Sequence, residues 1–469
     1  MNLADLTATE LLAKYRDGSV SPVEVVEDVL ARVDRWEPQL CALYAPDPAG
    51  ARSAAQESER RWRDGTAGAL DGVPVTVKEN IATRGTPVPQ GTAATALVPA
   101  AEDAPAAARL RAAGAVIFSK TTMPEYGMLS SGVSTFHRLT RNPWDLSKTA
   151  GGSSAGAAAA AAAGYGPIHV GTDIGGSIRL PAGWCGLVGL KPTHGRIAVG
   201  NPYAGRAIGP LTRTAADAAL ALSVMSGYDA RDHTSLPAAS DVFEAEVRGL
   251  RVALLLDAGV GLPVDPEVTA AVSAAADVLA AAGAVVEPIG PVITREMLDG
   301  LDRFWRIRSA TDIAALPEER RAKVLPQIRA WVSSAADLTP ADVFHGYSQM
   351  GAMAAAVGQV FTSYDVILSP VAPITAFAAE LAYPTDDPGR PFEHIGFTVP
   401  YNMSHHPATT VNVGWSASGL PIGAQLAVPH HQDLRALALA EYLAAHGAEV
   451  RPWPTLDSTR TERETGPWG

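Results

Sequence analysis

Three short segments carry polar side chains where packing alone does not require them. Lys78 follows an alternating valine run in GVPVTVKEN, Ser153 lies in AGGSSAG, and Ser177 lies in DIGGSIR. Burial behind such a strand disfavours the charged form of a lysine, so its pKa falls and its neutral amine can accept a proton near neutral pH. A hydroxyl both donates and accepts, so Ser153 can pass a proton from Ser177 to that amine. The three residues contain the parts of a serine hydrolase whose base is a lysine.

Each segment also has an explanation that involves no chemistry. Lys78 fits the solvated end of a strand, and the serines at 153 and 154 precede an alanine-rich run, where serine commonly caps free helix amides. The glycine pair before Ser177 fits a tight turn. The same two glycines, however, let the backbone approach a ligand and let successive amides point the same way, as an oxyanion requires. The residues by themselves leave these alternatives open.

Other catalytic motifs fit less well. The nucleophile elbow Gly-x-Ser-x-Gly excludes Ser153 and Ser177, because Ala155 and Arg179 stand where the second glycine belongs. Ser154 matches the letters, but NPWDLSKTA before it shows no buried-strand pattern, so we interpret this match as accidental. No Walker loop follows the glycines, and none of the 11 histidines lies in an HExxH zinc motif. We expect no metal and no organic cofactor.

The elements that must position these residues alternate between helices and short strands. Capping boxes at Thr7 and Ser21 predict two helices at the start of the chain. Further strands are expected at 73–78, 115–120, 251–257 and 284–289, and further helices at 105–113, at 268–282 and over much of 291–360. This alternation predicts an α/β layer architecture.

Composition limits the class of partner. The 469 residues are 47% hydrophobic and 18% charged, as in an ordinary globular protein. A formal charge of -12 argues against nucleic acid or an anionic membrane as a partner and favours a neutral organic substrate. Two cysteines, Cys41 and Cys185, provide neither a disulfide framework nor a paired-cysteine zinc site. With no secretory signal or membrane span visible, we expect a cytoplasmic monomer or homodimer.

The segments 72–80, 140–160 and 171–196 together resemble the amidase signature family, with weaker similarity at 366–377 and 419–426. The resemblance implies an α/β fold in which helices cover both faces of a central twisted mixed β-sheet. It also implies a single amidase domain over 1–469, with N-terminal helices at 1–65 and a signature core at 66–230. A variable helical insertion at about 290–360 would shape the substrate pocket.

The resemblance further implies a Ser-cisSer-Lys triad that cleaves an amide C–N bond through an acyl-enzyme. Ser177 would be the nucleophile, Ser153 the proton shuttle in a cis peptide, and Lys78 the base. The other residues implied by the family are the oxyanion-hole amides of Ile174, Gly175, Gly176 and Ser177, the bracing residues Ser154, Asp173 and Arg179, and the substrate-bordering loop of Gly127, Met128 and Leu129. Without the family, Asp173 and Arg179 fit a partly exposed ion pair.

The substrate is less well defined than the class of reaction. Trp305 and Trp331 favour aryl amides, and carbamates remain an alternative because a urethane presents a similar carbonyl and C–N bond. His405 and His406 either line the acyl or leaving-group pocket or cap a turn. Cys185 fits a small packed residue better than a nucleophile. A second hypothesis is the glutaminase-type A subunit of a tRNA-dependent amidotransferase, which needs a clamp for the α-groups of glutamine that the sequence does not reveal.

Overall fold

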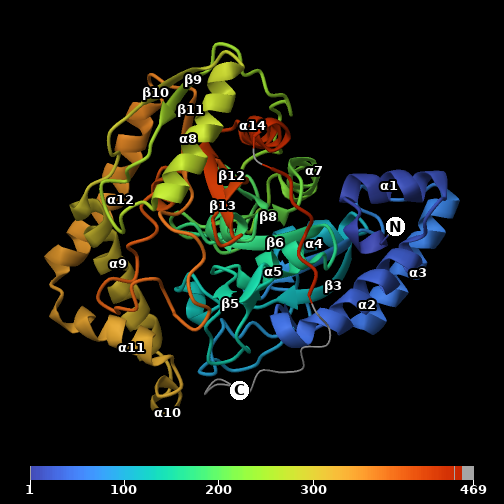
Figure 1. Cartoon of the computed structure of the whole chain (residues 1–469). Helices are drawn as coiled ribbons and strands as arrows, with labels where there is room; N and C mark the ends of the chain where they lie inside the picture. Colours follow the sequence, from blue (N-terminus) through green and yellow to red (C-terminus); the bar gives the residue numbers. More distant parts are fainter. Residues whose placement is uncertain (1, 448, 457–469) are drawn as a thin grey trace.

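The computed structural model describes residues 2–447 and 449–456, and in this part of the chain eleven strands form one mixed sheet. The strand order is β1-β3-β2-β6-β8-β7-β12-β13-β11-β9-β10. Figure 1 shows β9, β10 and β11 near α8 at the top of the view. Strands β3, β2 and β6 run parallel to one another, as do β11, β9 and β10. The pairs between β6 and β11 are antiparallel. The sheet is mixed, as expected.

The sheet strands are β1 (Leu43–Tyr44), β2 (Pro74–Lys78), β3 (Val116–Thr121), β6 (Ile168–Asp173), β7 (Val188–Lys191), β8 (Ala207–Thr212), β9 (Arg251–Leu254), β10 (Val285–Pro288), β11 (Val366–Pro370), β12 (Ala408–Trp415) and β13 (Pro421–Ala427). A separate two-stranded ribbon consists of β4 (Arg141–Asn142) and β5 (Asp145–Thr149).

The α-helices are α1 (Ala8–Asp17), α2 (Pro22–Leu40), α3 (Pro48–Asp64), α4 (Pro105–Ala112), α5 (Ala155–Ala163), α6 (Arg179–Trp184), α7 (Ala215–Met225), α8 (Pro266–Ala281), α9 (Arg295–Ala314), α10 (Glu318–Arg321), α11 (Pro326–Ser333), α12 (Pro340–Val360), α13 (Val399–Met403) and α14 (Asp433–His446). Short 3-10 turns lie at Leu3–Asp5, Glu125–Gly127 and Ser334–Asp337.

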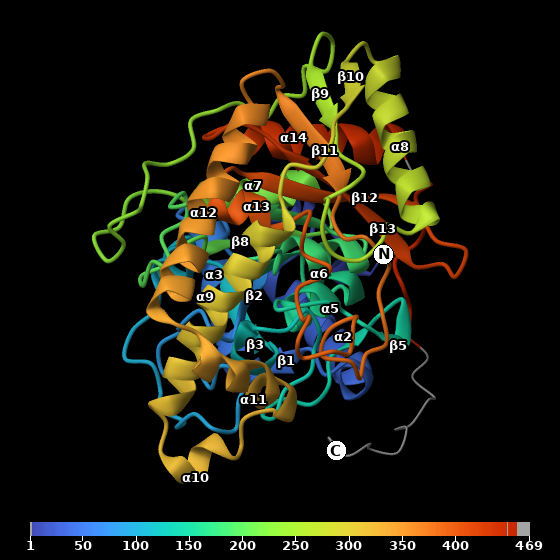
Figure 2. The ribbon, with the colours of Figure 1, turned by 90° about the vertical axis from the view of Figure 1, so that its left-hand side faces the viewer.

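Helices cover both faces of the sheet. Buried side chains of α4, α7 and α14 pack on one face of the strands around β2 and β6, and those of α2 and α5 pack on the other. Helices α8 and α14 cover the strands from β9 to β13. Figure 2 shows α9, α11 and α12 together on the side that faces the viewer. The predicted α/β fold with helices on both faces is confirmed.

Strand β2 directs Lys78 towards α5. Side chains alternate between the two faces of a strand, and Val75 and Val77 belong to the core under α4 and α7. Lys78 therefore points to the opposite face. Strands β2 and β6 are parallel neighbours, so their carboxyl ends meet at the same edge of the sheet. This edge brings Lys78 together with Thr172 and the loop that follows β6.

Local sequence signals account for many of the element boundaries. The capping boxes at Thr7 and Ser21 are present, and a third begins α12 at Thr339. The strands expected at 73–78, 115–120, 251–257 and 284–289 appear as β2, β3, β9 and β10, and the helices at 105–113 and 268–282 appear as α4 and α8. The segment before Ser154 does form a strand, β5, but in the ribbon outside the central sheet. Among the described residues, no helix combines the length and apolar character that crossing a bilayer requires.

Candidate active site

Lys78 is fully buried, and hydroxyl groups surround its amine. Its Nζ atom lies 2.8 Å from Ser153 Oγ, 3.1 Å from Ser154 Oγ and 2.9 Å from Thr172 Oγ1. Burial lowers the pKa of Lys78 to about 7, although nearby carboxylates, Asp173 first among them, act to raise it. The amine therefore titrates near neutral pH, and the interpretation of Lys78 as a solvated strand end is wrong.

The neighbouring hydrogen bonds orient the lone pair of this amine. Ser154 Oγ donates to the carbonyl oxygen of Thr172 at 3.2 Å, so it can only accept from the lysine. Thr172 Oγ1 accepts from Asn80 Nδ2 at 3.1 Å and from Lys78 Nζ at 2.9 Å. A neutral amine has two N–H groups and one lone pair. With both N–H groups bound to these oxygens, the lone pair is left for the hydroxyl of Ser153.

Ser153 and Ser154 lie just before α5, as a helix cap would, but Ser154 does not cap it. Ser154 occupies the N-cap position, and its side chain makes no capping hydrogen bond. It is committed to Lys78 and Thr172 instead, so the N-cap interpretation of this serine is wrong. The peptide bond between Gly152 and Ser153 is cis. Ser153 lines the same pocket as Ser177.

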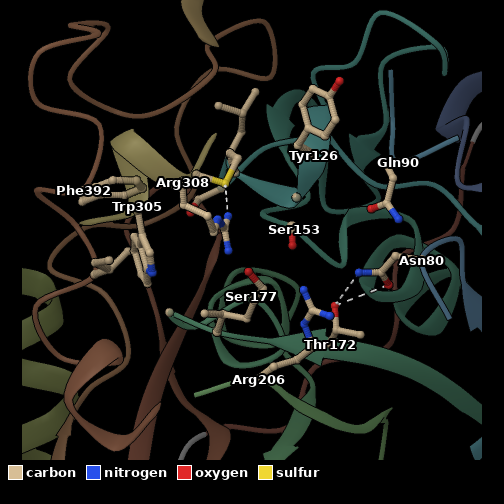
Figure 3. Close-up of a pocket in the computed structure, with 17 residues that line it drawn as sticks. Asn80, Gln90, Tyr126, Ser153, Thr172, Ser177, Arg206, Trp305, Arg308 and Phe392 are labelled. Carbon is tan, nitrogen blue, oxygen red and sulfur yellow. Dashed lines mark hydrogen bonds between the residues drawn. The ribbon is translucent and has the colours of Figure 1, made fainter. Parts of the chain in front are cut away.

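Ser177 lies on the loop after β6 with its side chain partly exposed towards the pocket. Figure 3 shows the hydroxyls of Ser177 and Ser153 pointing into the same space. Within the described part of the chain, no hydrogen bond joins these two hydroxyls. The hydrogen bond in this structure thus joins Lys78 to Ser153, and Ser177 lines the same pocket as Ser153.

A buried ion pair braces the Ser177 loop. Asp173 and Arg179 contact each other at 3.0 Å, and both side chains are inaccessible to solvent, so the partly exposed ion pair inferred without the family is wrong. Asp173 also accepts from Asn402 Nδ2 at 2.8 Å, and Arg179 donates to Thr398 O at 2.9 Å and to Gln425 Oε1 at 2.6 Å. Burial acts to raise the pKa of Asp173, but the Arg179 guanidinium and these hydrogen bonds hold it below its usual value.

One of the four amides that the resemblance assigns to an oxyanion hole already has an acceptor within the protein. The amide of Gly176 donates to Asp173 Oδ1 at 2.8 Å, so it is occupied. In the described residues, no acceptor contacts the amides of Ile174, Gly175 or Ser177. Three amides of the loop therefore remain available to a ligand at the pocket.

The pocket in front of Ser177 encloses about 720 Å³ of empty space when its solvent-open mouth is counted. Gly127, Met128 and Leu129 all line it, as the resemblance implied. Gly127 has a φ of +66°, and a Cβ at this position would lie 3.3 Å from Ser153 Oγ. Backbone conformation and space therefore both favour glycine beside Ser153.

Aromatic residues form another wall of the pocket. Trp305 and Phe392 line it together with Ile395, and the two aromatic rings meet edge-on with centroids 5.1 Å apart. Trp305 also faces Gly175, where a Cβ would come within 3.2 Å of the indole ring. Trp331 does not line the pocket but packs behind Phe392 at 5.6 Å.

His405 and His406 lie away from this pocket. His405 lines a second, solvent-open cavity and stacks on His194 with ring centroids 4.2 Å apart. His406 is buried between Phe361 and His430, with ring centroids 4.5 and 3.7 Å away. Neither histidine is among the described residues that line the pocket in front of Ser177.

Sequence reasoning missed several residues of this site. Thr172 directly precedes Asp173 in the glycine-rich segment around Ser177, and Asn402 lies in the YNMS segment beside the two histidines. These positions could have been found from their neighbours. Arg206 and Arg308 also line the pocket, and no local pattern marks either of them.

No arrangement of three or more His, Cys, Asp or Glu side chains suited to a metal ion occurs in the described residues. Cys185 is buried, and burial raises the pKa of its thiol. The polar groups that line the pocket are hydroxyls, side-chain amides, backbone amides and guanidinium groups.

Comparison with known families gives a match to the family model described as Amidase over residues 24–437. The chain belongs to the amidase signature family. The resemblance noted in the sequence is confirmed. An acylamidase of Rhodococcus erythropolis is 35% identical over 466 residues, covering 96% of this chain and 97% of the relative. The glutamyl-tRNA(Gln) amidotransferase A subunit of Roseiflexus castenholzii is 34% identical, covering 89% of this chain and 90% of the relative.

Solved structures of the family share the fold. A bacterial aryl acylamidase described as an amidase signature enzyme superposes with a TM-score of 0.86 at 29% identity, covering 94% of this chain and 96% of that chain. A 6-aminohexanoate cyclic dimer hydrolase superposes with a TM-score of 0.84 at 28% identity, covering 95% of this chain and 98% of that chain. Family membership makes this chain an amidohydrolase that acts on amide C–N bonds.

Proposed function

We propose that the chain cleaves small amides, aryl amides in particular, through an acyl-enzyme formed on Ser177 with Ser153 as proton shuttle and Lys78 as base. One observation carries the proposal. A fully buried amine, with its pKa lowered to about 7, is hydrogen-bonded at 2.8 Å to the cis serine that shares a pocket with Ser177. An exposed lysine would be almost entirely protonated at this pH.

The proposed acylation moves one proton along this relay. As Ser177 Oγ bonds to the carbonyl carbon of the amide, its proton passes to Ser153 and the Ser153 proton passes to Lys78. The electron pair of the carbonyl moves onto oxygen. The tetrahedral species then collapses, the C–N bond breaks, and the departing nitrogen takes a proton from Ser153, which takes one back from Lys78. Water attacks the remaining ester by the same relay, which restores Ser177 and releases the acid.

The oxyanion of both steps would lie against the free amides of Ile174, Gly175 and Ser177. Donors placed in advance where negative charge develops are each worth about 3 kcal/mol in acyl transfer. Asp173 and Arg179 would act as positioning residues, because Asp173 holds the Gly176 amide at 2.8 Å and thereby fixes the loop.

The aromatic wall supports an aryl group in the substrate. Trp305 and Phe392 present ring faces and edges to the pocket, and aromatic pairs in such geometry add to simple apolar burial. The acylamidase and aryl acylamidase relatives support the same class. The helical segment at about 290–360 would then set specificity through Trp305. Aryl urethanes are a further substrate class to test, because the triad would meet the same carbonyl.

Glutaminase action within an amidotransferase is the second candidate, because the A subunit of such an enzyme is 34% identical to this chain. Glutamine carries an α-ammonium group, which requires an anionic partner. No aspartate or glutamate is among the residues found to line the pocket. Strong ammonia release from glutamine, or copurification with a second protein at fixed stoichiometry, would favour this candidate over the stand-alone amidase.

Matched kinetics on a 4-nitroanilide, a primary amide and an aryl urethane test the proposal. We expect Ser177→Ala to lower kcat for the anilide by roughly 10⁴-fold or more, and Lys78→Ala by roughly 10² to 10⁴-fold. Wild-type rates in both variants would show that the assignment is wrong. For the urethane, carbon dioxide release that depends on Ser177 would establish carbamate cleavage.

A further inference from the structure

Two guanidinium groups face Ser177 without a carboxylate partner. Arg206 comes from the loop before β8 and Arg308 from α9, and both line the pocket (Figure 3). Across the described residues, neither arginine forms an ion pair. Arg206 Nη1 reaches only the carbonyl oxygen of Asn201 at 3.4 Å, and Arg308 Nη2 reaches only Met128 Sδ at 3.4 Å.

The three arginines that are buried in the described residues all have carboxylate partners. Arg179 pairs with Asp173, Arg196 with Asp433, and Arg32 with Asp5. Charged side chains taken out of water are normally paired in this way because desolvation is costly. The two pocket arginines are partly exposed and have no carboxylate partner among the described residues, and they line the cavity that would receive a substrate.

The hydrogen bonding of both groups is also incomplete. The Nε atoms of Arg206 and Arg308 are buried and have no acceptor in the described part of the protein. Burial, and after it the charge of Arg308, lowers the pKa of Arg206, so the two cations lie close enough to repel each other. An anion between them would relieve the repulsion and accept from the free N–H groups.

Tyr203 holds the two groups in the same neighbourhood. Its ring centroid lies 5.5 Å from the Arg206 Cζ atom and 4.8 Å from the Arg308 Cζ atom. Stacking on an aromatic ring occupies the face of a guanidinium and leaves its N–H edges for a ligand. The edges that remain are suited to a planar carboxylate, which binds arginine through two parallel hydrogen bonds.

We propose that the physiological substrate is an amide that carries a free carboxylate, which Arg206 and Arg308 bind while Ser177 attacks the scissile carbonyl. This inference rests on the proposed amidase function and specifies its substrate class. It replaces the neutral substrate favoured by the overall charge of -12, because the local field of the pocket is set by these two cations. The carboxylate belongs to either the acyl or the amine part.

An α-amino acid is a poorer fit than a simple acid. The residues that line the pocket include two arginines and neither aspartate nor glutamate. An α-ammonium group would therefore lie beside two cations without compensation. We expect glutaramate, which lacks this group, to be hydrolysed with a higher kcat/KM than L-glutamine.

Paired 4-nitroanilides measure the contribution of the carboxylate. Glutaryl 4-nitroanilide carries a carboxylate where pentanoyl 4-nitroanilide has a methyl group, so the ratio of their kcat/KM values isolates that charge on the acyl side. The ratio of the kcat/KM value for 4-acetamidobenzoate to that for acetanilide isolates the effect of a carboxylate on the amine side. We expect a preference for the acid of about tenfold to a hundredfold in one of the two pairs, as charge-assisted hydrogen bonds provide.

Variants test whether the arginines cause the preference. Arg206→Met and Arg308→Met should each lower the acid-to-neutral ratio about tenfold, mainly through KM, and the double variant should abolish it. Because both substrates meet the same variant, any change in the pKa of Lys78 cancels in the ratio. Arg303→Met, on α9 but outside the pocket lining, is the matched control and should leave the ratio unchanged.

Binding to the Ser177→Ala variant separates this inference from the proposed function. We expect calorimetry to show that glutaryl 4-nitroanilide binds this variant at least tenfold more tightly than the pentanoyl compound, and that added salt reduces the difference. Equal binding of the two compounds, together with equal kcat/KM in both substrate pairs, would overturn the inference and leave the amidase function standing. Preferential binding of the acid, without cleavage of any amide by the wild type, would instead overturn the proposed function.

Discussion

Lowering the pH from 8 to 6 should slow the enzyme by protonating Lys78. Its pKa lies at about 7, so about 90% of the amine is neutral at pH 8 and about 10% at pH 6, which predicts about a tenfold fall in kcat/KM. A lysine with an ordinary pKa would be only about 0.3% neutral at pH 8, so burial increases the available base about 300-fold at that pH. Activity rises with pH because the neutral amine is the reactive form.

The assay is kcat/KM for a neutral 4-nitroanilide between pH 5 and 9 at constant ionic strength, so that only enzyme groups titrate. Lys191 provides a control, because burial also lowers its pKa to about 7. Its amine donates to Pro192 O at 2.8 Å, and Lys191 is not among the residues that line the pocket. Lys191→Met should keep the inflection, and Lys78→Met should abolish turnover. A flat wild-type profile from pH 6 to 8, or an inflection that disappears in Lys191→Met, would refute the reasoning.

Other substitutions and reagents test separate parts of the site. Asp173→Asn should lower the free energy of unfolding in urea by about 3 kcal/mol, because it leaves the buried Arg179 charge uncompensated; an unchanged urea midpoint would contradict this. Trp305→Ala should lower kcat/KM for anilides about tenfold relative to aliphatic amides. Trp331→Ala should lower it less, because of these two tryptophans only Trp305 lines the pocket. Equal effects of the two substitutions would show that both tryptophans contribute to the aromatic wall together. Iodoacetamide at pH 8 should leave activity intact, because Cys185 is buried and its thiol pKa is raised; inactivation that tracks alkylation of Cys185 would count against a serine nucleophile.

The fold could be predicted from the sequence where local signals are strong. Capping boxes at Thr7 and Ser21 fix the starts of α1 and α2, and the valine alternation before Lys78 predicts both β2 and the face on which the lysine lies. The order of the eleven strands in the sheet could not be predicted from such local signals. It depends on which distant segments pair, such as β6 with β8 and β12 with β7, and no local pattern encodes that pairing.

The site was predictable where its residues lie within one motif. Lys78, Ser153 and Ser177 were identified from glycine-rich or strand-end surroundings, and the structure brings Lys78 and Ser153 within 2.8 Å of each other. Arg206 and Arg308 could not be identified as pocket residues in this way, because a single arginine in a loop or on a helix usually lies at the surface. Only the folded chain shows that the two converge on one pocket.

The contacts that each side chain makes were harder to predict than which residues belong to the site. Ser154 lies where a helix cap belongs, yet its hydroxyl contacts Lys78 of the distant strand β2 at 3.1 Å instead of capping the helix. His405 is adjacent to site residues in sequence but turns away into a second cavity. In both cases a contact between distant segments decided the role.

The most direct test of the account is to locate the acyl group during turnover. Wild-type enzyme mixed with a slowly hydrolysed 4-nitroanilide, quenched in acid within the first turnovers and digested for mass spectrometry, should carry the acyl mass on the peptide that contains Ser177. The Ser177→Ala variant should carry none. An acyl group on Ser153, Ser154 or Cys185, or full activity without Ser177, would contradict the central claim that a buried neutral lysine activates Ser177 through Ser153.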